Sequence, residues 1–353
     1  MGPPPNSLTP PRPRRRAYWT TQKERTVGQR SGRPAEGTGV FVTDGGVETD
    51  LMFRRGVDVP HFAAFVLLDT AEGRSALRDY YTGYVSIAVA SGRPLLLESP
   101  TWRANPDWGR LLGYDARDLE RVNSAAIEFM ADLRRDHVDA VGHILVSGTI
   151  GPRHDGYSAS SEPHPDVAFD YHRPQLAVFA AGPADLATAY TITHIGEAIG
   201  IVRAARAEGL PIAVSFTVDA DGRLLSGIDL AEAITAVDEA APPDYFLVNC
   251  AHPNHIASAV GSEPADWSRR IAGIRANAST AGHADLDAAI ARDDGTPGEF
   301  AAAQADLFDR LPHLSILGGC CGTDERHIDA MVREISRRAA EFAPGTPTLE
   351  DQR

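Results

Sequence analysis

The 353-residue chain is poor in several residue types, and each shortage excludes a class of protein. Its single lysine, Lys23, lies near the N-terminus, so Schiff-base chemistry, a pyridoxal phosphate linkage and a P-loop lack the lysine they need within the fold. Three cysteines are too few, and odd in number, for a secreted disulfide framework. No apolar run approaches the ~18 residues that span a bilayer. These shortages favour a globular protein of the reducing cytoplasm, with no membrane partner.

Charge is unevenly distributed along the chain. The formal net charge is −14, yet residues 1–37 hold eight basic side chains against two acidic ones, so the remainder carries −20. An acidic body of this size repels nucleic acid and anionic lipid, and we expect neither as a partner. The proline- and arginine-rich segment 1–37 has no apolar stretch typical of a secretory signal. We expect a disordered tail at 1–37, one domain at 38–342 and a C-terminal tail at 343–353.

From residue 39 onward, short apolar runs alternate with longer segments of helical period, such as 74–92, 116–136 and 194–209. Eight strands alternating with helices predict an α/β fold, the (β/α)8 barrel, which typically needs ~250 residues plus insertions. A doubly wound open sheet is the alternative, but it requires a GxGxxG turn after the first strand, and DGGVETDL is not one. The connection 151–184 is long, and its second half has a helical pattern. The predicted strands are 39–46, 94–100, 143–149, 185–191, 211–218, 245–250, 273–279 and 314–320.

All three cysteines fall at the C-terminal ends of predicted strands, where such barrels carry their catalytic residues. Cys250 ends the sixth strand, and the adjacent Cys320 and Cys321 end the eighth. Only the seventh strand separates these two ends, so the three thiols can converge on one side of the barrel mouth. The nearby glycines at 318, 319 and 322 supply the backbone freedom that two adjacent ligands need.

Three converging thiolates are typical of a zinc site with one open position, because catalytic zinc keeps three protein ligands and an exchangeable fourth. A buried cysteine can instead serve as a small apolar residue. A disulfide between Cys320 and Cys321 would indicate a thiol oxidoreductase, but it is strained and leaves Cys250 unexplained. Zinc held by three thiolates activates water poorly but accepts a further thiol, whose pKa falls on coordination. The pattern therefore predicts alkyl transfer to a substrate sulfur.

Over about residues 39–340 the chain resembles the homocysteine S-methyltransferase family in the order and spacing of four motifs. The resemblance implies a zinc-bearing (β/α)8 barrel that methylates homocysteine to methionine. The motifs are VTDGGVETDL at 42–51, GTIGP at 148–152, LVNCAHP at 247–253 and LGGCCGTD at 317–324.

The same resemblance implies roles for individual residues. It implies that Asp44, followed by Gly45 and Gly46 in the first motif, lies against the amino-acid backbone of the acceptor. The zinc ligands that it implies are Cys250, Cys320 and Cys321.

One position departs from the family pattern. Family members usually end the fourth strand with a Glu-Thr pair, whose carboxylate can hold the ammonium group of the substrate; here the pair is Tyr190-Thr191. Glu98, at the end of the second strand, is a candidate replacement, and we expect Glu98 and Tyr190 both to contact the substrate. The amide of Asn249, at the end of the sixth strand, can position substrate or form a turn. A related small thiol is thus an alternative acceptor, and a zinc- or thiol-binding barrel without turnover is an alternative function.

The chain has no room for a separate cobalamin or folate domain, so we expect a small methyl donor. S-methylmethionine, S-adenosylmethionine and betaine are the candidates, and each carries an onium centre. Aromatic faces attract such a charge, and Trp102 and Trp108 follow the second predicted strand. We therefore expect Trp102 to contact the donor, with simple packing as the alternative role of both rings.

Overall fold

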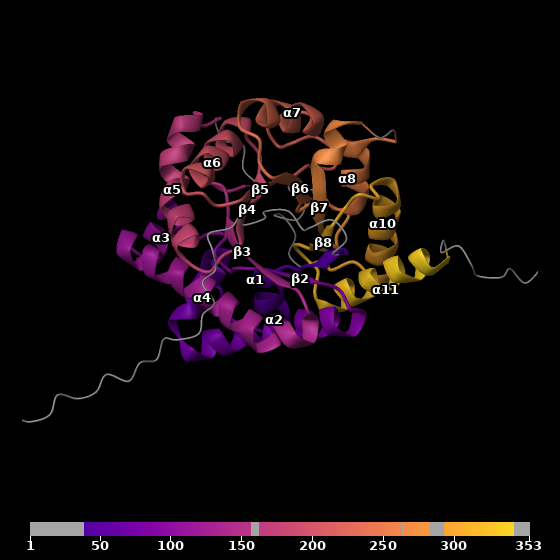
Figure 1. Ribbon diagram of the computed structural model, residues 1–353, viewed down its shortest axis with the longest axis horizontal. Coiled ribbons are helices and arrows are strands. Elements are labelled where there is room, and N and C mark those ends of the chain that lie inside the picture. Colours follow the sequence, from indigo (N-terminus) through magenta and orange to yellow (C-terminus); the bar gives the residue numbers. More distant parts are fainter. Residues whose placement is uncertain (1–38, 157–161, 263–264, 282–292, 342–353) are drawn as a thin grey trace, which may run out of the picture. The chain divides into compact units, whose positions relative to one another are not determined.

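The computed structural model describes residues 39–156, 162–262, 265–281 and 293–341, so the two expected tails lie outside the described residues. Eight parallel strands close into a barrel in chain order, which confirms the predicted (β/α)8 fold (Figure 1). The strands are β1 (Phe41–Val42), β2 (Leu95–Glu98), β3 (Ile144–Ile150), β4 (Leu186–Ile192), β5 (Ile212–Phe216), β6 (Tyr245–Asn249), β7 (Ile271–Ala276) and β8 (Ile316–Gly319).

The barrel closes where β1 pairs in parallel with β8, with Phe41 opposite Ile316. One apolar cluster contains Phe41, Leu247 and Ile316 together with residues of β2, β4, β5 and β7, and no helix contributes to its buried members. A cluster drawn from the strands alone fills the interior of the barrel, as expected for strands whose side chains alternate between the two faces. Tyr190 belongs to this cluster and lies near the C-terminal end of β4.

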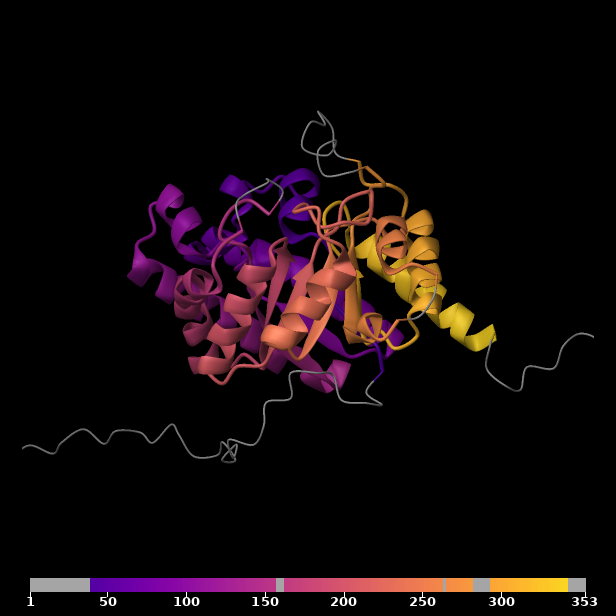
Figure 2. The same cartoon turned by 90° about the horizontal axis from the view of Figure 1, so that it is seen from above.

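Helices surround the strands and bury their outward faces (Figures 1 and 2). Local signals fix several boundaries: α4 begins after Asp115, which forms a capping box with Asp118, and α2 ends at Gly92 in a left-handed conformation. No helix of the described residues is long and apolar enough to cross a membrane. The helices are α1 (Val47–Thr49), α2 (Ala71–Ser91), α3 (Pro106–Leu112), α4 (Ala116–Val141), α5 (Pro165–Ala181), α6 (Ile195–Ala207), α7 (Leu230–Ala240), α8 (Pro253–Val260), α10 (Pro297–Arg310) and α11 (Glu325–Glu341).

The predicted strands overlap the observed ones, but their bounds differ by one or two residues in most cases and by more at the first and seventh strands. The first strand is much shorter than 39–46, because the chain leaves the sheet after Val42 and enters α1 and a π-helical turn at Asp50–Arg54. The seventh strand begins at Ile271, two residues before the predicted start. The second half of the connection 151–184 is helical, as predicted, and forms α5.

Candidate active site

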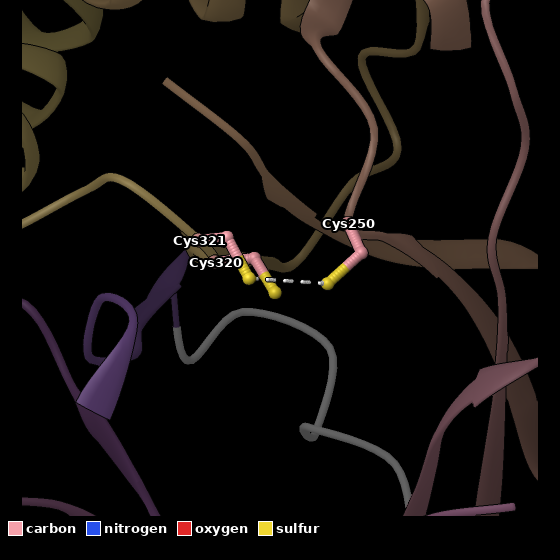
Figure 3. Close-up of side chains that lie close together, drawn as sticks. All are labelled: Cys250, Cys320 and Cys321. Carbon is pink, nitrogen blue, oxygen red and sulfur yellow. Dashed lines mark hydrogen bonds between the residues drawn. The ribbon is translucent and has the colours of Figure 1, made fainter. Parts of the chain in front are cut away.

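The three cysteines of the chain converge at the C-terminal ends of β6 and β8 (Figure 3). Their Sγ atoms all lie within 4.8 Å of one another, and those of Cys250 and Cys321 are 3.9 Å apart. None of the three forms a disulfide. Contacts with Cys250 and Cys321 hold the pKa of Cys320 well below its usual value, whereas contacts with Cys250 and Cys320 raise the pKa of Cys321. Such a cluster can hold a metal ion by sulfur alone.

The backbone around the cysteines is held in unusual conformations. Cys250 has a φ of 54°, a left-handed value that is unfavourable for a residue with a side chain. After Cys321 the chain turns through Gly322, whose φ is 83°. Gly318 and Gly319 do not have positive φ; a side chain there would collide with neighbouring threonines. Of the three expected flexible glycines, only Gly322 therefore serves the turn, and the other two permit close packing.

Asn249 links three strand ends through its side-chain amide. Its Oδ1 accepts hydrogen bonds from the backbone N–H of Thr191 (3.0 Å) and the hydroxyl of Ser215 (2.7 Å), and its Nδ2 donates to Thr191 Oγ1 (2.9 Å). Thr191 itself has a φ of 63°, so this amide stabilises a strained residue. Asn249 lines the cavity described next, as expected of a substrate contact, but its amide is already used within the protein.

A cavity of about 600 Å³ lies over the three cysteines at the mouth of the barrel. Its volume is within the range typical of small-molecule sites. Five carboxyl groups line it, from Asp44, Glu48, Glu98, Asp155 and Asp293, against the guanidinium groups of Arg103 and Arg275. Acidic residues therefore outnumber basic ones among the charged side chains of the lining.

Asp44 and Arg275 form a buried ion pair in the cavity wall. An Nη2 of Arg275 lies 2.6 Å from Asp44 Oδ1, and the guanidinium also donates to the carbonyl oxygens of Gly45 and Gly319, both at 2.9 Å. The other carboxylate oxygen of Asp44 accepts from Tyr80 (3.0 Å). Burial raises the pKa of Asp44 to about 6, although Arg275 opposes the shift. Arg275 thus ties the end of β7 to the segments after β1 and β8.

Glu98 and Tyr190 meet across the cavity wall. The hydroxyl of Tyr190 donates to Glu98 Oε1 at 2.8 Å, and Thr149 Oγ1 donates to Oε2 at 3.0 Å. Glu98 is buried, and this burial raises its pKa despite those hydrogen bonds and the nearby Arg275. The guanidinium of Arg275 lies 5.0 Å from the centre of the Tyr190 ring. The phenol at the end of β4 therefore supports a carboxylate that comes from β2.

Arg103 occupies the aromatic cluster in which we expected the donor's charge. Its Cζ lies 3.8 Å from the ring centre of Trp108 and 4.8 Å from that of Trp102. It also donates to the carbonyl oxygen of His61. Trp102 does line the cavity, and its indole N–H donates to the backbone oxygen of Tyr190 at 3.3 Å. The cation over these rings is thus one of the protein's own.

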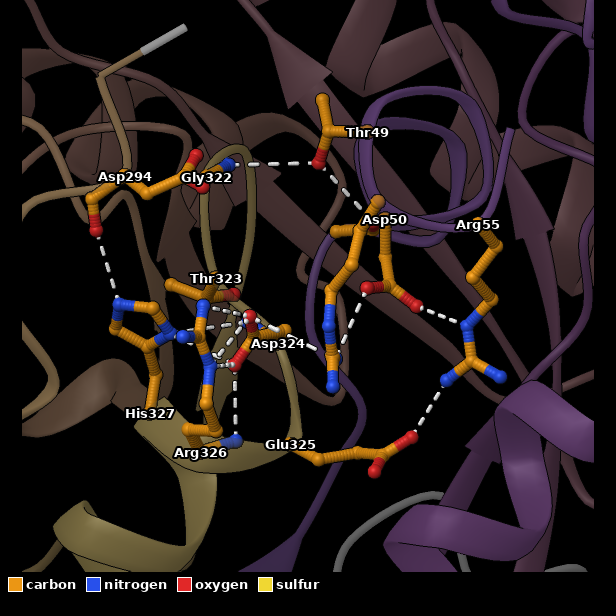
Figure 4. Close-up of polar contacts among 12 residues, drawn as sticks. Thr49, Asp50, Arg55, Asp294, Gly322, Thr323, Asp324, Glu325, Arg326 and His327 are labelled. Atoms are coloured by element: carbon orange, nitrogen blue, oxygen red, sulfur yellow. Dashed lines mark hydrogen bonds and ion pairs between the residues drawn. The ribbon is translucent and has the colours of Figure 1, made fainter. Parts of the chain in front are cut away.

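A network of charged side chains fixes the loop that carries Cys320 and Cys321 (Figure 4). Asp324 is fully buried and accepts from Arg326 (2.6 Å), while one oxygen lies 3.1 Å from His327 Nδ1. Burial alone would raise the pKa of Asp324, but the His327 and Arg326 contacts hold it well below its usual range. Arg55 bridges Asp50 (2.6 Å) and Glu325 (2.5 Å), so the segments after β1 and β8 are joined.

Sequence reasoning missed five charged residues of the cavity: Glu48, Arg103, Asp155, Arg275 and Asp293. Glu48 is half-buried on α1 and faces the cavity, and removal from water raises its pKa to about 7. A carboxyl group with so perturbed a pKa is typical of functional sites. Position gave a signal for Arg103, which closely follows the second predicted strand. Arg275 is the third residue of the predicted strand 273–279 and lies near the C-terminal end only of the observed strand, β7.

Comparison with known proteins agrees with the fold and the motifs. The family model described as homocysteine S-methyltransferase matches residues 41–335. Two solved structures of the homocysteine methyltransferase MmuM from Escherichia coli are similar in fold. The oxidized form is 16% identical, with a TM-score of 0.66, covering 83% of this chain and 94% of MmuM. The metallated form is 17% identical, with a TM-score of 0.65, covering 85% of this chain and 96% of MmuM.

Because the family model spans most of the described barrel and all three cysteines, this chain belongs to the homocysteine S-methyltransferase family.

Proposed function

We propose that this chain is a zinc-dependent methyltransferase that moves a methyl group from a small onium donor to the sulfur of homocysteine, giving methionine. The observation that carries the proposal is the convergence of three sulfur atoms under an acidic cavity in a member of this family. Such a site requires reduced cysteines, and this requirement supports a reducing compartment such as the cytoplasm as the proposed location of the reaction.

The spacing of the cysteines suits zinc. Two sulfurs each ~2.3 Å from a tetrahedral zinc ion lie about 3.8 Å apart. The Sγ atoms of Cys250 and Cys321 are 3.9 Å apart, and Cys320 Sγ lies in the same cluster. Cys250, Cys320 and Cys321 would hold the zinc ion, which would leave one position open for a thiol and lower the pKa of that thiol. The redox alternative uses only Cys320 and Cys321 and gives no role to Cys250.

The acceptor's ammonium group is best matched by Glu98. Arg275 forms a direct ion pair with Asp44, whereas it acts on Glu98 through charge, and Glu98 accepts hydrogen bonds from neutral hydroxyls that include those of Tyr190 and Thr149. We assign Asp44, with Gly45 and Gly46, to the wall beside the acceptor backbone. Tyr190 then replaces a carboxylate on β4 by orienting a carboxylate from β2, so the departure from the family pattern leaves an ammonium site in place.

The donor site is selected by charge. An acidic cavity attracts a cationic donor and disfavours an anionic one such as a folate. In the transfer, the acceptor sulfur forms a bond to the methyl carbon while the bond to the donor's onium atom breaks, and its electron pair stays with the departing donor. The departing donor is neutral at that atom, so no general acid is needed, and the residues of the cavity contribute orientation and exclusion of water.

Zinc content and product formation together test the proposal. We expect one zinc per chain in the wild type by elemental mass spectrometry, and loss of zinc in Cys250→Ala, Cys320→Ala and Cys321→Ala. His252→Asn is the matched control, because His252 lies two residues after Cys250 and caps α8 by accepting from the N–H of Asn254 (3.2 Å). Asparagine preserves such a cap, so this variant should keep its zinc.

The same proteins are then incubated with L-homocysteine and either S-methylmethionine or S-adenosylmethionine. Wild type and His252→Asn should form methionine, and the cysteine variants should not. A wild type without zinc would contradict the metal site. Zinc without methionine from either donor would support the alternative of a barrel that binds zinc or thiols but does not turn over.

A further inference from the structure

We propose that Arg103 binds the carboxylate of the methyl donor and thereby selects donors that carry one. This inference rests on the proposed function and adds to it a chemical requirement on the donor. The structural basis is an arginine whose guanidinium lines the cavity while aromatic rings and a backbone carbonyl hold it in place.

The orientation of Arg103 is fixed by its surroundings. Only 9% of its side chain is exposed, and it packs against Trp108, Trp102 and, at 6.0 Å, Phe62. Its hydrogen bond to the carbonyl of His61 holds one Nη atom. A guanidinium fixed in this way can form a charge-assisted hydrogen bond with a carboxylate, and it stays charged at every working pH. Because its side chain is ordered before ligand arrives, binding loses little conformational entropy.

Two carboxylates of the cavity interact with Arg103: Glu48 through its charge, and the partly exposed Asp155. Asp155 lies 3.7 Å from an Nη of Arg103, longer than a hydrogen bond, and 42% of its side chain is exposed. An exposed partner at that distance contributes little to stability and keeps its own access to water. A substrate carboxylate entering the cavity can therefore take the place of Asp155 at the guanidinium.

The other arginine of the cavity is not suited to this role. Arg275 is bound to the carboxylate of Asp44 at 2.6 Å and to the carbonyls of Gly45 and Gly319. The two arginines thus divide the cavity: Arg275 belongs to the wall with Asp44 and Tyr190, and Arg103 to the side with Trp102 and Trp108. If the acceptor binds at the wall that contains Arg275, then Arg103 is the arginine that can bind the carboxylate of the donor.

The test compares a donor that has a carboxylate with one that lacks it. S-methylmethionine and trimethylsulfonium both carry a sulfonium methyl group, but only the first can bind a guanidinium. In Arg103→Gln we expect the KM for S-methylmethionine to rise at least tenfold, while kcat changes little and the kinetics with trimethylsulfonium stay within twofold of wild type. Unchanged trimethylsulfonium kinetics also show that the variant is folded.

A matched control separates stacking from ligand binding. Arg153 also lies over an aromatic ring, 4.9 Å from the centre of Tyr171, but it does not line the cavity. Arg153→Gln should leave the KM for both donors unchanged. Asp155→Asn should lower the KM for S-methylmethionine, because it removes the competing anion. If Arg103 had a purely structural role, Arg103→Gln would affect both donors equally. Asp155→Asn would then not lower the KM for S-methylmethionine.

Direct binding keeps the inference separate from the reaction. Calorimetric titration of S-methylmethionine into the zinc-loaded protein should show weaker binding by Arg103→Gln than by wild type, whether or not methionine is formed. A wild type that binds this donor in an Arg103-dependent way but forms no product would overturn the proposed function alone. Equal binding by both proteins, or an equal loss of both donors in Arg103→Gln, would overturn the role of Arg103.

Discussion

Tyr190 donates its phenolic hydrogen to the buried carboxylate of Glu98 at 2.8 Å and so joins the ends of β4 and β2. The Tyr190 ring belongs to the apolar interior cluster, while its hydroxyl group joins Glu98, Thr149 and the nearby Arg275 in a polar group beside that cluster. A buried carboxylate that loses a hydrogen-bond donor becomes harder to ionise. Replacing Tyr190 on β4 is therefore expected to change how readily Glu98 on β2 ionises.

Tyr190→Phe should weaken binding of the acceptor. Glu98 would keep the hydrogen bond from Thr149 but lose the one from Tyr190, so its pKa would rise further and less of it would be charged at neutral pH. A lost hydrogen bond to a charged group corresponds to about 1.5–3 kcal/mol. We expect the KM for homocysteine to rise about tenfold or more, as measured by initial rates at saturating donor.

Tyr81→Phe is the matched control for that variant. Tyr81 donates to the backbone carbonyl of Glu98 at 2.8 Å, so its removal deletes a hydrogen bond to the same residue without touching the carboxylate. This variant should lose stability but keep the acceptor KM of wild type. An acceptor KM that changes equally in both variants would contradict a specific role for the Tyr190 hydroxyl.

Acceptor binding should fall as the pH is lowered, and from a higher pH than an ordinary glutamate would dictate. Burial raises the pKa of Glu98, so its ionised form, which attracts ammonium, is present above that raised pKa and is lost on acidification through it. L-methionine is a suitable ligand because it has no thiol to titrate. Its Kd, measured between pH 5 and 8, should increase toward low pH.

Glu98→Gln provides the control for this pH dependence. It should bind L-methionine weakly at every pH and lose the part of the pH dependence that Glu98 causes. Asp44, whose pKa is about 6, titrates in the same range and will leave a residual slope. A Glu98→Gln protein with the affinity and slope of wild type would assign the ammonium to another group.

Arg275→Met should strongly destabilise the protein. The substitution leaves Asp44 buried beside Tyr80 without its cation, and breaking a buried pair from one side typically costs about 3–5 kcal/mol. Urea unfolding should show this loss. The double variant Arg275→Met with Asp44→Asn should recover part of it, because no unpaired charge remains. Equal losses in the single and double variants would mean that the carbonyl contacts of Arg275, and not the ion pair, account for its effect.

Asp324→Asn should loosen the hold on zinc without removing a ligand. Asp324 anchors the loop after Cys321 through Arg326 and His327, and residues that support metal ligands typically change affinity by about 10–100-fold. Competition with a chelator measures the effect. Asp329→Asn is the control, because this exposed residue pairs with Arg333 on the same helix, α11, away from the loop. Equal zinc affinity in both variants would contradict the anchoring role.

Sequence analysis predicted well the elements that are determined by residues close together in the chain. Each strand is a short apolar run bounded by turn residues, so all eight were found, and the cysteines were located because each ends such a run. The pairing of Arg275 with Asp44 joins residues 231 positions apart, and no local pattern encodes it. The place of Arg103 over Trp102 and Trp108 depends on side-chain directions in a loop. The hydrogen bonds of Asn249 were not foreseen for the same reason, because its partners come from β4 and β5.

The left-handed backbone of Cys250 lowers the stability of the fold at a residue whose sulfur belongs to the candidate metal site. A non-glycine residue with a φ of 54° carries a strain of about 1–3 kcal/mol, which glycine would relieve. A lineage freed from the need to bind metal would gain stability by replacing this cysteine, since most proteins lie close to their stability threshold. Cysteine at this position is therefore less favourable for stability than glycine, and it places its sulfur in the cluster of three.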